Sequence, residues 1–151
     1  MKKEQKVGYD FIGVGVGAIV FNNQGRVFLA QRGPQARNEQ GTWEFPGGSV
    51  EFGETLRDAI KREFLEEFEM IIEIEELLNV SDHILPQERQ HWVSPTFIGR
   101  HIGGTPHIAE PQKCSAIGWF SLTDLPQPLS IVTQDDVKCY RARGHRFKGG
   151  V

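Results

Sequence analysis

The segment from residue 54 to 68 constrains this 151-residue chain most, because it combines a helical repeat with acids on the apolar side. Its apolar residues recur at the three- and four-residue spacing of an amphipathic helix: Leu56, Ala59, Ile60 and Phe64. Thr55 stands where a helix N-cap is expected. An ordinary surface helix carries its acids opposite such a stripe, so the positions of the acids decide whether this is one.

Three glutamates lie on or beside the apolar stripe. At about 100° per residue, Glu63 and Glu67 point into the same sector as Ala59 and Ile60, and Glu66 lies next to them. Unpaired carboxylates there would repel one another and lose hydration. A solvated face with incidental acids fits this geometry poorly. Divalent cations fit it better, and oxygen-only ligands favour Mg²⁺, with Mn²⁺ as a substitute, over zinc.

The residues that flank this helix extend the same hypothesis. Pro46-Gly47-Gly48 presents backbone carbonyls at the approach to the helix, where one could join a metal's coordination shell. A Glu54–Arg62 ion pair could fix the preceding loop against the helix, although an ordinary surface bridge would contribute little. A metal held by several carboxylates is commonly used to bridge phosphates and activate water.

The charge of the chain is unevenly distributed. Residues 51–76 carry ten acids and three bases, so this segment is −7 in a chain whose net charge is −3, and the remainder is +4. The overall charge excludes a globally basic nucleic-acid binder. A cation bound by the acids would leave the remaining +4 as a complement to a polyphosphate.

Length and pattern predict a single α/β or α+β domain over 11–143. A flexible lead over 1–10 and a basic, disordered tail over 144–151 flank it. Residues 71–80 fit a strand or a helix, and Pro95 suggests an edge strand or a bulge. The other elements are expected as strands at 11–21, 26–31, 42–45, 91–101 and 117–120, and a terminal helix at 133–143.

Cysteine content and the N-terminus indicate the compartment. Cys114 and Cys139 are the only cysteines and form no C-x-x-C pair, so a disulfide framework and a thiolate zinc site are both disfavoured. The apolar run 11–21 is too short to span a bilayer, and it is better explained as a buried strand than as a signal peptide. We therefore expect a cytoplasmic protein with no membrane partner.

The spacing of the charged residues matches a known motif. Gly48 is followed after five residues by Glu54, then after seven by Arg62-Glu63 and, two residues later, by Glu66-Glu67. This resembles the Nudix box, G-x5-E-x7-R-E-U-x-E-E-x-G-U, with one departure, because Glu69 stands at the second family Gly. The resemblance extends roughly from residue 11 to 129 through four further segments, Gly13–Gly17, Phe45–Gly48, Val50–Thr55 and Trp119–Pro126.

The resemblance implies an α/β/α sandwich around a mixed β-sheet and Mg²⁺-dependent hydrolysis of a nucleoside diphosphate linked to a moiety X. In this family, Glu63, Glu66 and Glu67 would bind metal together with the Gly47 carbonyl. Glu54 and Arg62 would orient that shell. A glutamate of the box or of a later loop would deprotonate the attacking water, with Glu66 the first choice and Glu110 a possible substitute.

The sequence alone does not determine which residues contact the substrate or what the substrate is. Arg32 and Arg37 could meet phosphates or be exposed solubilising charges, and Phe45 could stack a base or pack in the core. The resemblance leans toward nucleoside triphosphates, with no specific nucleic acid as partner and a homodimer possible. The alternatives are a non-catalytic Nudix module that binds nucleotide or RNA, and an unrelated acidic interaction domain. The family Gly at position 69 would serve a left-handed helix end; Glu69 either keeps that conformation at a cost of roughly 1 kcal/mol or ends the helix in another way.

Overall fold

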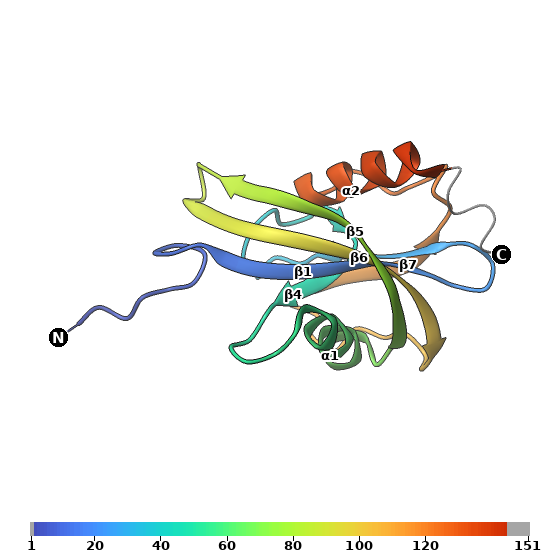
Figure 1. The fold of residues 1–151 in the computed structure, drawn as a ribbon, viewed down its shortest axis with the longest axis horizontal. Coiled ribbons are helices and arrows are strands. Elements are labelled where there is room, and N and C mark those ends of the chain that lie inside the picture. The colour runs from blue at the N-terminus through green and yellow to red at the C-terminus, as the bar shows by residue number, and fades with distance from the viewer. Residues whose placement is uncertain (1, 145–151) are drawn as a thin grey trace.

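The computed structural model describes residues 2–144, in which a mixed sheet lies between two helices (Figure 1). The helices are α1 (Leu56–Phe68) and α2 (Ile131–Ala142), and they cover opposite faces of the sheet. The strands are β1 (Gly13–Phe21), β2 (Val27–Arg32), β3 (Trp43–Glu44), β4 (Gly47–Ser49), β5 (Ile71–Leu85), β6 (Gln90–Gly103) and β7 (Cys114–Phe120). This arrangement confirms the expected α/β/α sandwich.

The sheet is mixed because one central pairing is parallel. Its strand order is β3-β2-β1-β6-β5, with β4 paired to β1 and β7 paired to β2. β1 and β6 run parallel, whereas the other pairs are antiparallel. β4 and β2 therefore share one side of β1, and β4 pairs with its first half, at Gly15–Gly17. This pairing sets Gly47 and Gly48 beside the helix that follows them.

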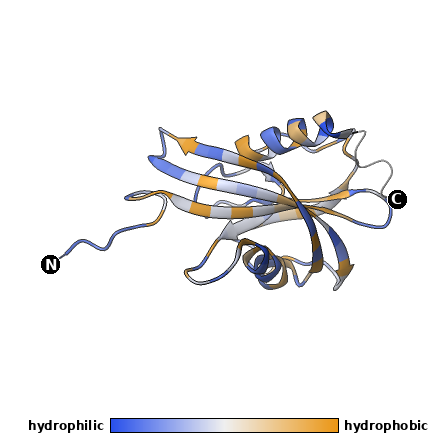
Figure 2. Ribbon diagram, in the orientation of Figure 1, coloured by the Kyte–Doolittle hydropathy of each residue, from blue (hydrophilic) through white to orange (hydrophobic). Residues whose placement is uncertain are grey.

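Two apolar clusters fill the layers on either side of the sheet. One packs Ala59, Ile60, Phe64 and Phe68 of α1 against alternate residues of β1 and β2. The other packs Val137 of α2 against the opposite face. Figure 2 shows that both helices carry hydrophilic as well as hydrophobic segments. The first helix is capped as expected, since the Thr55 side chain accepts a hydrogen bond from the Asp58 N–H.

The position of Pro95 differs from expectation. β6 lies between β1 and β5, so the edge-strand prediction is wrong. The β1–β6 pairs run to Val14–Val93 and resume at Gly17–Thr96, and Pro95 falls in the gap between them. A proline, which has no N–H to donate, is therefore accommodated inside the sheet at an interruption of the ladder.

The N-terminal segment, expected as a flexible lead over 1–10, contains a turn in the described residues. Residues 6–11 form a turn in which the Gly8 N–H donates to the Phe11 carbonyl and the Asp10 N–H donates to the Lys6 carbonyl. The turn docks on β6, where the His91 N–H donates to the Gly8 carbonyl. The expected tail over 145–151 lies outside the described residues, and within residues 2–144 neither helix has the length and hydropathy that a bilayer-spanning segment needs.

Candidate active site

The charged face of α1 lies against β4 at Gly48, and β4 lies close against β1 at Gly47. A Cβ at Gly48 would collide with the carboxylate of Glu63, and a Cβ at Gly47 would collide with the backbone carbonyl of Val16. The side chain of Glu63 is only 12% exposed. The sequence analysis therefore placed this glutamate correctly, on the inner side of the helix.

Arg62 joins the acids of this region. Its Nε donates to Glu54 Oε2 at 2.9 Å and its Nη2 donates to Glu54 Oε1 at 2.5 Å, which confirms the expected ion pair. Its Nη1 donates to Glu63 at 3.0 Å and to Glu66 at 3.3 Å, and its Nη2 also donates to the Ser49 carbonyl. One guanidinium thus ties the loop, the strand β4 and the helix together.

Glu67 has the most perturbed carboxyl of the helix. Burial, followed by the negative charges of Glu63 and Glu44 and a hydrogen bond with Glu63, raises the pKa of Glu67 to about 9. Glu110, in the later loop, adds to the same effect. A carboxyl that stays protonated at neutral pH beside other acids marks a place where added positive charge is favourable.

Glu67 and the acids around it line one cavity of about 510 Å³, here called the α1 pocket. Its acidic lining includes Glu44, Glu51, Glu63, Glu67 and Glu110, and Gly47 and Gly48 lie at its wall. An oxygen-rich donor set of this kind suits a hard divalent cation. In residues 2–144 no three His, Cys, Asp or Glu side chains already converge closely enough to hold an ion, so binding one requires these side chains to turn toward one another. Glu66 does not line the cavity; its side chain is 61% exposed and contacts Arg62.

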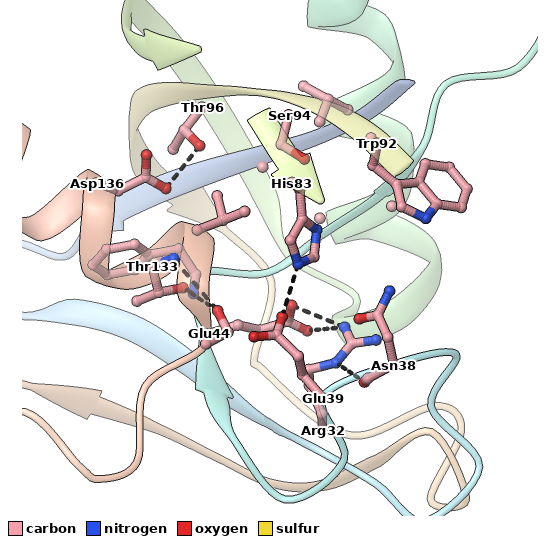
Figure 3. Close-up of a pocket in the computed structure, with 18 of the residues that line it drawn as sticks. Arg32, Asn38, Glu39, Glu44, His83, Trp92, Ser94, Thr96, Thr133 and Asp136 are labelled. Atoms are coloured by element: carbon pink, nitrogen blue, oxygen red, sulfur yellow. Dashed lines mark hydrogen bonds and ion pairs between the residues drawn. The ribbon is translucent and has the colours of Figure 1, made fainter. Parts of the chain in front are cut away.

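A second cavity, the α2 pocket, opens between the sheet and the start of α2 (Figure 3). It shares Arg32, Arg37, Glu44, Gly47 and Gly48 with the α1 pocket, so the two cavities adjoin at these residues. The rest of its lining is mostly polar or aromatic and includes Asn38, Glu39, His83, Trp92, Ser94, Thr96, Thr133 and Asp136. Together the pockets offer a mixed polar and aromatic compartment next to an acidic one.

Arg32, Phe45 and Glu110 take different places in this site. Arg32 donates to both carboxylate oxygens of Glu44 at 3.0 Å, and it lines both pockets. Phe45 is 5% exposed and belongs to the core cluster of the α2 side, although it also lines the α2 pocket. Glu110 lines the α1 pocket and pairs with Lys113 at 3.4 Å. The structure thus brings Arg32 and Glu110 to the acidic cavity and places Phe45 in the hydrophobic layer.

Asp136 was missed by the sequence analysis. It is 1% exposed, accepts a hydrogen bond from the Thr96 hydroxyl at 2.8 Å, and accepts another from Asn79 at 3.4 Å. Burial raises its pKa to about 7. Its signal was available: Thr133, Asp136 and Val137 share the buried face of α2, so this helix also carries an acid on its inner side.

Glu39 and His83 form a second pair that the sequence did not indicate. Glu39 Oε2 lies 3.0 Å from His83 Nε2, and Glu39 Oε1 accepts a hydrogen bond from the Ile131 N–H at the start of α2. Burial alone would raise the pKa of Glu39, but these hydrogen bonds and the nearby charges lower it below its usual value. The pair joins the loop after β2 to β5 and α2, and so fixes one wall of the α2 pocket.

Comparison with known proteins assigns this architecture to a family. A family model described as NUDIX domain matches residues 12–142. The chain is 34% identical over 116 residues to the 8-oxo-dGDP phosphatase NUDT18 of Mus musculus, an alignment that covers 74% of this chain and 33% of that protein. It is also 35% identical over 111 residues to an ADP-ribose pyrophosphatase of Methanocaldococcus jannaschii, covering 74% of this chain and 62% of that protein.

A solved structure that matches most of this chain gives the same assignment. The crystal structure of a MutT NUDIX hydrolase from Burkholderia pseudomallei is 38% identical, with a TM-score of 0.78, and the match covers 85% of this chain and 97% of that one. The chain spans only about a third of the length of the mouse relative, so that protein's activity does not transfer directly. With a family match over residues 12–142, and with Gly48, Glu63 and Glu67 of the box lining one pocket, this chain belongs to the NUDIX family.

Proposed function

We propose that this protein hydrolyses a phosphoanhydride bond in a nucleoside diphosphate linked to a further group, with Mg²⁺ as the cofactor. The observation that carries the proposal is the crowding of Glu63, Glu67, Glu44 and Glu110 around one cavity. Burial, together with the charges of these neighbouring acids, raises the pKa of Glu67 to about 9. The similarity to an 8-oxo-dGDP phosphatase and to an ADP-ribose pyrophosphatase supports the same class of bond.

Divalent metal ions are in general use among Nudix hydrolases, and the residues here suit one. Glu63, Glu66 and Glu67, with the Gly47 carbonyl, would hold it; when bound, the ion neutralises phosphate charge and lowers the pKa of water. Arg62 holds Glu63 and Glu66 in place, and Glu54 holds Arg62. The polar α2 pocket would take the nucleoside, leaving the phosphates in the α1 pocket.

Two glutamates are candidates for removing the proton from the attacking water. Glu66 is the first choice because it stands in the box; its carboxylate is 61% exposed and would have to leave Arg62 to reach the cavity. Glu110 is the second, because it already lines the α1 pocket. The rates of Glu66→Gln and Glu110→Gln, measured against pH, assign the base to the variant that loses the acidic limb of the profile.

The test is a substrate panel with product identification in Mg²⁺ or Mn²⁺, repeated with Glu67→Gln. We expect the panel to include at least one nucleotide that is turned over, and we expect Glu67→Gln to lose on the order of a hundredfold or more in kcat. Asp58→Asn is the matched control, since Asp58 is an exposed acid of the same helix. An unchanged rate in Glu67→Gln would contradict the proposal. Binding without turnover across the panel would instead favour a non-catalytic module that binds nucleotide or RNA.

Oligomeric state and compartment remain predictions. Cys114 and Cys139 are both free in the structure, as a reducing cytoplasm would allow. Size-exclusion chromatography with light scattering measures whether a homodimer forms.

A further inference from the structure

The α1 pocket is lined by four cations as well as by its acids: Lys6, Arg32, Arg37 and Lys113. Two of them are neutralised by carboxylates, since Arg32 pairs with Glu44 and Lys113 pairs with Glu110. Within residues 2–144, neither Lys6 nor Arg37 has a carboxylate within 4.0 Å. The pocket thus presents two positive charges that the described protein does not pair.

Arg37 is held in position by neutral partners. Its guanidinium lies over the ring of Trp92, 4.0 Å from the centroid, and its Nη1 donates to Ser49 Oγ at 3.1 Å. Its backbone carbonyl accepts a hydrogen bond from Gln90. A guanidinium fixed by an aromatic ring and a hydroxyl keeps its full charge and free N–H groups for an anion.

Lys6 reaches the pocket through the N-terminal turn. Its ammonium lies over the Tyr9 ring, 4.2 Å from the centroid. The Tyr9 hydroxyl in turn accepts a hydrogen bond from Gln90 at 2.8 Å, so the turn is attached to the same residue that holds the Arg37 carbonyl. Gly8 is required here, because a Cβ at its φ of +83° would collide with Trp92.

The buried Gln90 side chain connects the two segments that carry Lys6 and Arg37 through hydrogen bonds. It is 4% exposed, and its Oε1 accepts hydrogen bonds from Asn38 at 3.0 Å and from Trp92 Nε1 at 2.9 Å. Its Nε2 donates to Tyr9 and to the Arg37 carbonyl. A single buried amide therefore sets the turn that carries Lys6 and the loop that carries Arg37 relative to each other.

Arg37 and Lys6 occupy different positions in the two adjoining pockets. Arg37 lines both, so it lies where the nucleoside compartment meets the acidic one. Lys6 lines the α1 pocket and is not part of the α2 pocket. Under the proposed function the nucleoside occupies the α2 pocket and the phosphates occupy the α1 pocket. Arg37, which lines both, would then meet the phosphate nearest the nucleoside, and Lys6, which lines only the α1 pocket, would meet a phosphate farther from it.

We propose that Lys6 and Arg37 form a phosphate subsite, and that Lys6 binds the terminal phosphate and makes the enzyme select nucleoside triphosphates over diphosphates. This inference rests on the proposed function. Lys6 and Arg37 are positioning residues here, and they act through electrostatic attraction to phosphate oxygens rather than by proton transfer. Arg37 holds the phosphate nearest the nucleoside and so serves both classes of substrate.

The experiment compares kcat/KM for a nucleoside triphosphate and the matching diphosphate in Lys6→Gln. We expect about a 10-fold loss for the triphosphate, carried mainly by KM, and less than a threefold change for the diphosphate. Arg37→Gln should lower both by similar factors. Lys3→Gln is the matched control: it removes an exposed lysine of the same segment that lines none of the cavities described here, and it should change neither.

A binding measurement separates failure of this inference from failure of the proposed function. Calorimetry with inorganic tripolyphosphate and pyrophosphate needs no turnover, and Lys6→Gln should weaken only the tripolyphosphate. If wild type hydrolyses nucleotides but Lys6→Gln changes both substrates equally or neither, the subsite is wrong. If wild type hydrolyses nothing, the proposed function fails, and the calorimetry alone then supports or overturns the subsite.

Discussion

The carboxylate of Glu54 accepts two hydrogen bonds from the guanidinium of Arg62, at 2.9 and 2.5 Å, across the junction of the loop and α1. The Arg62 hydrogen bond is the main reason that the pKa of Glu54 falls to about 2. A carboxyl whose folded pKa is depressed stabilises the protein above its unfolded pKa and loses that effect as pH falls through the folded value. The Glu54–Arg62 pair is therefore intact from neutral pH down to about pH 2.

Arg62→Lys should impair the metal site while leaving the fold intact. A lysine keeps the charge but cannot hold Glu54 with two N–H groups and reach Glu63 and Glu66 at once. Residues that orient metal ligands typically change metal affinity or activity by about 10- to 100-fold, and we expect a loss in this range. Rates measured over a Mg²⁺ titration give the result, with Lys61→Gln on the exposed side of the same helix as control. A rate equal to wild type at every Mg²⁺ concentration would show that the two hydrogen bonds are dispensable.

Alanine at the two neighbouring glycines of β4 should produce opposite phenotypes. At Gly47 the new methyl group meets the backbone of Val16 and Gly17, which cannot move without disturbing β1, so we expect a loss of stability of about 3 kcal/mol or more. At Gly48 it meets the end of the Glu63 side chain, which can rotate away, so we expect a folded protein with little activity. Thermal melting and turnover of both variants test this, and a Gly48→Ala enzyme at full activity would contradict the assigned place of Glu63.

Replacing Glu69 with glycine should stabilise the protein. Glu69 ends α1 in the left-handed region, at φ 53° and ψ 32°, as its place at the family Gly led us to expect. Relieving that conformation is worth about 1 kcal/mol, while the exposed contact with His107 at 3.2 Å contributes little. Urea denaturation of Glu69→Gly measures the gain, and Glu76→Gly inside β5 should show the opposite sign. Activity should survive in Glu69→Gly, because no ligand is removed.

Asp136 should make the stability of the protein decrease as pH rises toward neutrality. Its folded pKa, raised by burial from 3.8 to about 7, means that the native state holds a proton which the unfolded chain releases above about pH 4. Stability is therefore fully present below the unfolded pKa and is lost between about pH 4 and 7, by an amount on the order of 4 kcal/mol. Asp136→Asn should make this part of the profile less steep, measured by urea denaturation at several pH values, while the raised pKa of Glu67 leaves a remaining slope in the same direction. An equally steep profile in the variant would assign the loss to another group.

The first helix shows how much of the site the sequence contained. Its cap at Thr55, its left-handed end at Glu69 and its inward Glu63 all follow from local rules, namely capping, glycine preference and the 3.6-residue period. The Glu54–Arg62 pair followed from spacing on the same segment. Such features depend on residues that are close in sequence, so one chain suffices to predict them.

The rest of the site depends on contacts between distant segments. Arg37 was ambiguous in the sequence because only Trp92, some fifty positions away, distinguishes a held guanidinium from a solvated one. The attachment of the turn that carries Lys6 could not be predicted either, because its hydrogen-bond donor is the amide of Gln90, which is distant in the sequence. Pro95 was misplaced for a similar reason, since the interruption that accommodates it comes from the register of β1. Only Asp136 could have been found, by applying to α2 the test that was applied to α1.

The parallel pairing of β1 with β6 also determines the order in which the molecule can be completed. During synthesis at roughly 5 to 20 residues per second, β6 (Gln90–Gly103) emerges about 4 to 15 s after β1 (Gly13–Phe21), and until then one edge of the central strand β1 has no partner. β2 and β4 can pair only with its other edge. The nascent chain therefore exposes an aggregation-prone ribbon throughout that interval, and soluble yield should respond more strongly to substitutions in β6 than to equally buried ones in α1.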